Sequence, residues 1–194
     1  MKSANVLILP GWQNSDAQHW QSRWEQTHGF SRVEQHDWMR PLRGDWTARL
    51  EDVLLGCDEP AVLVAHSLGC LLTAAWAAHS GNLQRVKAAF LVAPPDVERD
   101  DIRQILPGWC TPPWQALPFK SAVLASSNDP FCSLARAAEF ADIWGADFVD
   151  LGPQGHVNTE SALGDWPAGL EQLRQLLDID GAISTPSVPT PTLN

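Results

Sequence analysis

The chain has 194 residues, of which 44% are hydrophobic and 19% charged, with a formal net charge of −10. This length and composition are ordinary for one globular domain, and a negative field of this size disfavours nucleic acid and anionic membrane surfaces as partners. No long apolar run is free of polar interruption and the first residues lack a signal-peptide pattern, so we expect no membrane span and a cytoplasmic protein.

Short apolar runs alternate with helix-like segments along the whole chain. In chain order, we predict a strand at 5–10, a helix near 17–28, a weaker strand at 32–37, a helix near 45–55, a strand at 61–66, a helix at 68–79, a strand at 86–94, an irregular Pro- and Trp-containing segment at 94–118, a strand at 121–127, a helix near 133–144, a strand at 146–152 and a helix at 163–177.

The predicted strands are continuous Val, Leu, Ile and Ala runs rather than alternating ones, which is typical of parallel strands covered on both faces. Strand–helix alternation then indicates an α/β fold, a doubly wound three-layer α/β/α sandwich. We expect residues 1–178 to form this domain and residues 179–194, which are rich in Ser, Thr and Pro, to form a flexible tail.

Three polar clusters follow predicted strands, where parallel sheets bind their ligands. Ser67 follows the third strand, Asp129 the fifth and His156 the sixth. The order serine, acid, histidine is that of α/β-hydrolases, in which histidine takes the serine proton and the acid orients the histidine. We therefore predict Ser67 as nucleophile, His156 as base and Asp129 as acid.

Ser67 lies in the pattern A-x-S-x-G, formed with Ala65 and Gly69, where a nucleophile elbow usually has G-x-S-x-G. The small residues are needed because the tight strand-to-helix turn crowds the backbone. The backbone N–H groups of Leu68 and of Trp12, in the turn after the first strand, are the predicted oxyanion hole. The alternative interpretation is that Ser67 only caps the helix that follows it.

The acid has a competitor in Asp96, which follows the fourth strand, whereas Asp147 and Asp150 are interpreted as solvated. Pro130 favours Asp129, because it would hold that residue in a fixed turn. The four cysteines show no C-x-x-C spacing and are expected to be reduced thiols: Cys57, Cys70, Cys110 and Cys132. The histidines show no metal-binding spacing, so we expect neither a metal nor a cofactor.

With these motifs in place, the sequence resembles the small serine hydrolases typified by retinoblastoma-binding protein 9, from about residue 5 to residue 177. The resemblance rests on LPGW near the start, AHSLG at the elbow, PPW ending at Trp114, SSNDPF at the acid and GPQGHVN at the base. It implies a six-stranded parallel sheet of order 2-1-3-4-5-6 and the same triad. It also implies a substrate pocket lined by Trp114, under a minimal lid at 94–118; we add His66, beside the serine, to this pocket.

The segment LGCDE, residues 55–59, fits the L-x-C-x-E pattern with which proteins dock to the retinoblastoma pocket. Docking needs an extended, exposed peptide, and this segment spans a predicted helix end and the start of a buried strand. We therefore interpret the match as structural.

The sequence thus predicts a cofactor-free serine hydrolase acting on a small ester or aminoacyl ester or amide. The alternative from another class is a hydrolase-fold interaction protein with a vestigial triad. A non-hydrolytic, haloperoxidase-like use of the triad also stays open, because the fold does not determine the acyl acceptor. The sequence carries no indication of the oligomeric state.

Overall fold

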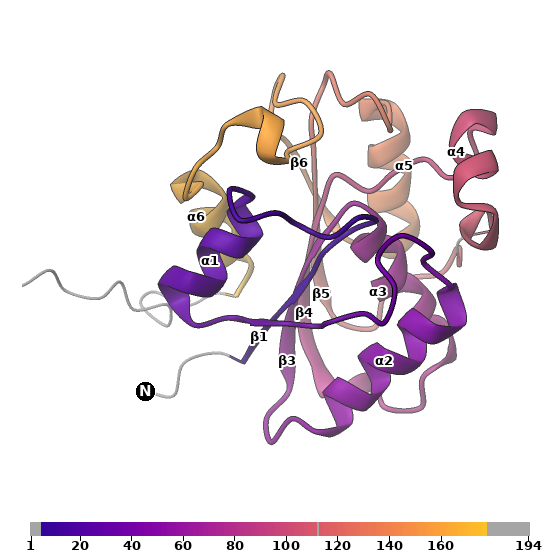
Figure 1. Ribbon diagram of the computed structural model, residues 1–194, viewed down its shortest axis with the longest axis vertical. Helices are drawn as coiled ribbons and strands as arrows, with labels where there is room; N and C mark the ends of the chain where they lie inside the picture. The colour runs from indigo at the N-terminus through magenta and orange to yellow at the C-terminus, as the bar shows by residue number, and fades with distance from the viewer. Residues whose placement is uncertain (1–4, 112, 178–194) are drawn as a thin grey trace, which may run out of the picture.

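The computed structural model of the protein describes residues 5–111 and 113–177 (Figure 1). The tail predicted at 179–194 lies outside the described residues. No helix in these two ranges is long and apolar enough to cross a membrane.

Six strands form one sheet in the order β2-β1-β3-β4-β5-β6, and every neighbouring pair is parallel. This confirms the predicted fold class and strand order. The strands are β1 (Val6–Leu9), β2 (Ser31–Arg32), β3 (Ala61–His66), β4 (Val86–Val92), β5 (Lys120–Ala125) and β6 (Asp147–Asp150).

Helices cover both faces of the sheet, which makes the predicted three layers (Figure 1). One face packs against α1 (Trp20–His28) and α6 (Pro167–Leu176); the other packs against α2 (Arg43–Leu55), α3 (Leu68–His79) and α5 (Leu134–Trp144). The remaining helical elements are α4 (Asp100–Ile105) and the 3₁₀ turns η1 (Leu83–Arg85), η2 (Pro107–Trp109) and η3 (Thr159–Ser161).

Apart from shifts of a few residues at the ends of elements, the described chain differs from the predicted elements in three places. The weaker strand predicted at 32–37 overlaps the two-residue strand β2 only at Arg32, and Val33 is the only apolar residue of that polar segment that is buried against the sheet. The segment 94–118 contains α4, whose first turn carries two aspartates that favour a helix start. The last helix begins only at Pro167, since proline is well placed in a first turn.

Candidate active site

Ser67 stands at the turn between β3 and α3, with φ 53° and ψ −123°. A side chain at positive φ is strained, and such strain is typical of nucleophile elbows. The turn packs tightly against β1, because a Cβ built on Gly69 would lie 2.3 Å from the carbonyl oxygen of Leu9. Ala65, in place of the usual glycine, is completely buried. The serine hydroxyl is thus presented at the carboxyl end of the sheet.

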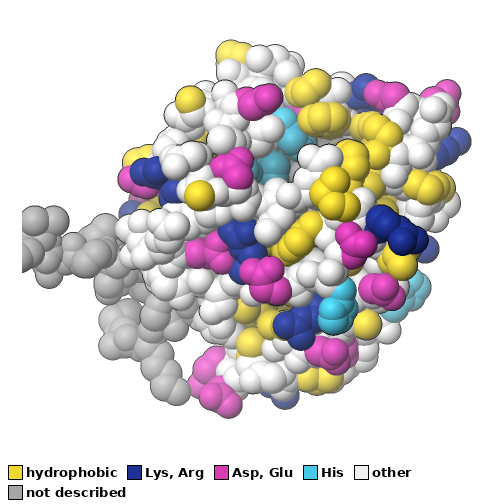
Figure 2. Space-filling view, viewed as in Figure 1, with side chains coloured by type: hydrophobic (Ala, Val, Ile, Leu, Met, Phe, Trp, Pro, Cys, Tyr) yellow, Lys and Arg dark blue, Asp and Glu magenta, His cyan; other side chains and the backbone are white. Residues whose placement is uncertain are grey.

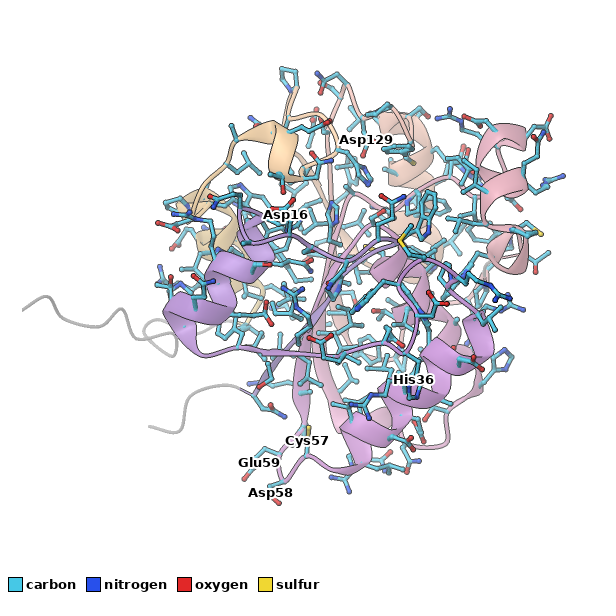
Figure 3. All side chains as sticks on the ribbon, viewed as in Figure 1. Asp16, His36, Cys57, Asp58, Glu59 and Asp129 are labelled. Carbon is cyan, nitrogen blue, oxygen red and sulfur yellow. The ribbon has the colours of Figure 1, made fainter. Side chains whose placement is uncertain are left out.

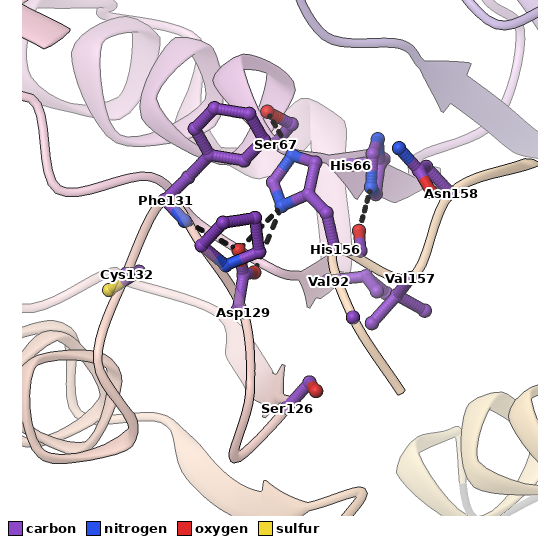
Figure 4. Close-up of polar contacts among 12 residues, drawn as sticks. His66, Ser67, Val92, Ser126, Asp129, Phe131, Cys132, His156, Val157 and Asn158 are labelled. Carbon is purple, nitrogen blue, oxygen red and sulfur yellow. Dashed lines mark hydrogen bonds and ion pairs between the residues drawn. The ribbon is translucent and has the colours of Figure 1, made fainter. Parts of the chain in front are cut away.

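The structure brings Ser67, His156 and Asp129 together over 89 and 27 residues of sequence separation (Figure 4). His156 Nε2 lies 3.0 Å from Ser67 Oγ, and His156 Nδ1 lies 2.9 Å and 3.0 Å from the two carboxylate oxygens of Asp129. A carboxylate only accepts, so Nδ1 carries the proton and Nε2 accepts from the serine hydroxyl.

The loops that carry Asp129 and His156 are joined by hydrogen bonds to two side chains. Asn128 Oδ1 accepts from Gly155 N at 2.7 Å, and Ser126 Oγ accepts from Gln154 N at 2.8 Å. These bonds link the loop after β5 to the loop after β6. Together with the backbone bond from Ser127 N to the carbonyl oxygen of Gly152 at 3.0 Å, they hold the carboxylate and the imidazole close to each other.

Asp96, the competing acid, is placed elsewhere. Its carboxylate lies 3.5 Å from the guanidinium of Arg136 on α5, and its backbone N–H donates to the carbonyl oxygen of Phe131 at 3.0 Å. Asp129, by contrast, has a side chain only 3% exposed and faces the imidazole. Of the two carboxylates, Asp129 alone contacts His156.

The turn after β1 approaches the elbow closely. A Cβ built on Gly11 would lie 2.8 Å from the Cβ of Ser67 and 3.2 Å from the backbone nitrogen of Leu68, so only glycine fits here. Within the described chain, neither the Trp12 N–H nor the Leu68 N–H donates a hydrogen bond to a protein acceptor. Two free amide donors beside the serine are what an oxyanion hole requires.

Ser67 and His156 open into a cleft of about 580 Å3. One wall is apolar and is formed by Pro95, Ile102, Ile105, Leu106 and Phe131. The opposite wall is polar and is formed by Gln13, Asn14, Asp16, Asn158, Thr159 and Glu160. Figure 2 shows histidine side chains within this hollowed face and hydrophobic side chains along one side of it. The arrangement is amphipathic: an apolar group fits one wall and a polar group the other.

Two further histidines, His66 and His19, lie beside the triad in this cleft. Their ring centroids are 4.8 Å apart, and that of His66 is 4.9 Å from that of His156. Burial lowers the pKa of His19 to about 4. Burial also holds the pKa of His66 well below its usual value, helped by the two neighbouring histidines. Both rings are therefore neutral near pH 7.

The structure brings His66, Trp12 and Leu68 to the cleft, as predicted for the pocket and the oxyanion hole, but places Trp114 outside it. Trp114 stacks on Phe140 of α5 at 5.4 Å, and the Arg136 guanidinium lies 5.0 Å from the Trp114 ring centroid. Trp114 therefore does not line the cleft as expected, because its indole ring packs against α5 instead.

Sequence reasoning missed several residues of the cleft. His19 and Asp16 come from the loop after β1, Phe131 from the loop after β5 and Glu160 from the loop after β6. The available signal was position, since each follows a strand whose carboxyl end faces the site. The polar loop residues do not otherwise differ from ordinary surface residues.

Three other sequence features concern a metal site, the cysteines and the L-x-C-x-E match. In the described ranges, no group of three or more His, Cys, Asp or Glu side chains could hold a metal ion. All four cysteines are free thiols, and burial together with Asp96 and Asp129 raises the pKa of Cys132 to about 12. Figure 3 shows Cys57, Asp58 and Glu59, from the L-x-C-x-E match, at the end of the molecule remote from Asp129.

A parallel sheet covered on both faces, with a serine at a strand-to-helix elbow, defines an α/β-hydrolase. The chain belongs to the serine hydrolase family, whose model matches residues 6–175. No curated protein matches significantly.

Solved structures share this architecture. A YdeN-like hydrolase from Pectobacterium atrosepticum is 29% identical, with a TM-score of 0.80 over 94% of each chain. The ydeN gene product of Bacillus subtilis is 18% identical, with a TM-score of 0.72 over 91% of this chain and 100% of that one. Est1E from Butyrivibrio proteoclasticus, solved with ferulic acid bound, is 11% identical, with a TM-score of 0.70 over 92% of this chain and 91% of that one.

Proposed function

We propose that the protein hydrolyses small esters or aminoacyl esters or amides through a Ser67–His156–Asp129 triad. The observation that carries the proposal is the continuous chain of contacts from Ser67 Oγ through the imidazole to the Asp129 carboxylate, each within 3.0 Å. Membership of the serine hydrolase family supports the reaction type.

In this mechanism, Ser67 attacks the carbonyl carbon while its proton passes to Nε2 of His156. The Leu68 and Trp12 amides stabilise the oxyanion, and Asp129 stabilises the imidazolium that forms. His156 then gives its proton to the leaving group, which departs and leaves an acyl-enzyme. Water, deprotonated by the same imidazole, releases the acid and restores the serine.

The residues named above also support proposals on the branch of the family, the cellular location and the acyl group of the substrate. The elbow, acid and base motifs support placement near the retinoblastoma-binding protein 9 branch of the family, and the four free thiols support a reducing, cytoplasmic location. Est1E holds ferulic acid, an aromatic acid. By analogy, and because the apolar wall includes Phe131, we propose that the acyl group of the substrate is apolar or aromatic.

A fluorophosphonate probe tests the proposal, because it reacts covalently with an activated serine. We expect wild-type protein to be labelled and the variants Ser67→Ala and His156→Ala to remain unlabelled. Hydrolysis of p-nitrophenyl butyrate should fall in both variants by several orders of magnitude. Ser127→Ala, which changes an exposed serine near the acid loop, is the matched control and should label like the wild type.

An unlabelled, folded wild-type protein without esterase activity would contradict the proposal. It would favour the alternative of a hydrolase-fold interaction module. Circular dichroism of each variant separates loss of the nucleophile from loss of the fold.

A further inference from the structure

His66 is a buried, uncharged histidine directly before the serine, and the proposed chemical steps do not use it. The residue is 5% exposed and is the last residue of β3. Burial and two neighbouring histidines hold its pKa well below the usual value. A neutral imidazole has one donor and one acceptor nitrogen, and which nitrogen is which depends on its partners.

The partner of His66 determines this tautomer. His66 Nε2 lies 2.9 Å from the backbone carbonyl oxygen of His156. A carbonyl oxygen can only accept, so Nε2 carries the proton. His66 Nδ1 therefore carries a lone pair and can only accept a hydrogen bond.

This acceptor nitrogen has no protein partner within the described residues, where the His66 side chain makes no hydrogen bond other than that of Nε2. The fully buried side-chain atoms left unpaired there are His19 Nε2, His28 Nδ1, Gln35 Oε1 and Trp144 Nε1. His66 Nδ1 is not among them, because it keeps accessible surface where His66 lines the cleft. Figure 4 shows this nitrogen directed away from the His156 carbonyl, on the side where Asn158 lies.

The charges around the cleft also favour a ligand that donates hydrogen bonds. Asp16 and Glu160 are lining carboxylates, and the lining contributed by the described chain includes no lysine or arginine. His19, the neighbouring histidine, is neutral, because burial lowers its pKa to about 4. The Nδ1 atom of His19 accepts a hydrogen bond from Gln21 N at 3.2 Å, so the proton of this imidazole is on Nε2. His19 therefore has no free acceptor nitrogen that could bind the donor group of a substrate in place of His66.

We propose that His66 Nδ1 is a specificity-determining acceptor that binds an O–H or N–H group of the substrate close to the scissile carbonyl. This inference rests on the proposed hydrolase function and narrows its substrate class to donor-bearing esters or amides. His66 also serves as a positioning residue, because its Nε2–H holds the backbone of the catalytic base. One imidazole thus couples substrate choice to the loop that carries His156.

Two pairs of esters that differ by one hydroxyl group test the proposal. p-Nitrophenyl butyrate and p-nitrophenyl 3-hydroxybutyrate probe a donor on the acyl side, and ethyl butyrate and 2-hydroxyethyl butyrate probe one on the alcohol side. We expect wild-type kcat/KM to favour the hydroxylated ester in at least one pair by roughly fivefold, the contribution of one hydrogen bond.

Two variants separate the roles of the two nitrogens. His66→Gln retains an N–H group at the position of Nε2 and removes the acceptor at Nδ1, so the preference ratio should fall to about one. His66→Asn retains an acceptor at the position of Nδ1 and removes the donor to His156, so kcat should fall for both esters while the ratio persists. A ratio measured on one protein sample cancels any loss of folded enzyme.

Equal kcat/KM values within both wild-type pairs, or a preference that survives in His66→Gln, would overturn the proposal. Failure of the underlying function has a different signature: none of the four esters would be hydrolysed, and the fluorophosphonate would not label Ser67.

Discussion

At the scale of single residues, we expect Asp129 to determine which imidazole nitrogen of His156 can accept a proton from Ser67. Its carboxylate holds the proton on His156 Nδ1 from 2.9 Å. In Asp129→Asn, the amide group can donate to Nδ1 and so favour the tautomer with its proton on Nε2. We expect kcat for p-nitrophenyl butyrate to fall on the order of 10⁴-fold.

The matched control for this change is Asp96→Asn, which alters the competing carboxylate beside Arg136. We expect it to change kcat by less than about threefold, since the Asp96 carboxylate lies beside the guanidinium of Arg136 and does not contact His156. Equal losses of activity in the two variants would mean that the acid has been assigned wrongly.

The lowered pKa of His19 makes the free energy of unfolding depend on pH in the acid range. Its pKa is about 4 in the folded protein and its ordinary value is 6.5. Between these pH values the unfolded chain takes up a proton that the folded protein does not, so the free energy of unfolding falls as the pH falls from about 6.5 to about 4. At about 1.4 kcal/mol per pKa unit, His19 contributes about 3 kcal/mol to this fall.

Denaturant unfolding at pH 7.0 and pH 4.5 measures the effect. His19→Asn keeps an acceptor at the start of α1. We expect this variant to lose less stability between the two pH values than the wild type does. Some loss should remain, because the pKa of His66 is also lowered in the folded protein. His36→Gln, at an exposed histidine, is the control. An unchanged pH dependence in His19→Asn would contradict the assignment.

At the scale of elements, the start of α3 depends on the absence of a side chain at position 69. A Cβ there would lie 2.3 Å from the Leu9 carbonyl oxygen and 3.1 Å from the Pro10 carbonyl oxygen, both backbone atoms that cannot rotate away. Gly69→Ala must therefore move α3 away from β1. We expect a destabilisation of at least about 2 kcal/mol and a large loss of activity, because α3 carries the Leu68 amide.

Gly44→Ala is the matched control, since a Cβ at this α2 position meets nothing within 4 Å. It should stabilise the protein by up to about 1 kcal/mol, because alanine restricts the unfolded chain. Thermal unfolding of the two variants gives the comparison. A Gly69→Ala protein as stable as the wild type would show that the elbow tolerates a wider turn.

The elements that could be predicted from the sequence are those whose residues are almost all apolar and therefore buried. β3 and β4 are continuous apolar runs, and α3 follows Ser67 directly, so their order and pairing could be inferred. The limits of β2 and α6 could not be inferred, because β2 ends where its pairing with β1 ends, and α6 begins after Trp166, which has the left-handed backbone angle φ 42°. α4 escaped detection because six residues give too short a hydrophobic period.

The residues of the candidate site also fall into those that could be predicted from the sequence and those that could not. Ser67, Asp129 and His156 could be selected because a motif and a strand end coincide at each. Phe131 and His19 could not, since only folding brings their loops to the cleft. Trp114 shows the opposite error: an aromatic residue in the expected lid was assigned to the pocket, yet the Phe140 ring and the Arg136 guanidinium hold it against α5.

At the scale of the whole molecule, net charge and cleft charge have the same sign. The chain carries a formal charge of −10, and the carboxylates of Asp16 and Glu160 line the cleft. The negative potential therefore repels anionic esters during their approach and attracts cationic ones. Salt screens this field: the Debye length falls from about 30 Å at 10 mM to about 8 Å at 150 mM ionic strength.

We therefore expect opposite salt effects on substrates of opposite charge. Raising the ionic strength from 10 to 150 mM should increase kcat/KM several-fold for a p-nitrophenyl hemisuccinate and decrease it for a p-nitrophenyl ester with a trimethylammonium group. p-Nitrophenyl butyrate is the neutral control. Glu160→Gln should weaken both effects if the carboxylate in the cleft dominates, and should leave them almost unchanged if the total charge does. Parallel salt responses of the three esters would show that the field does not reach the scissile bond.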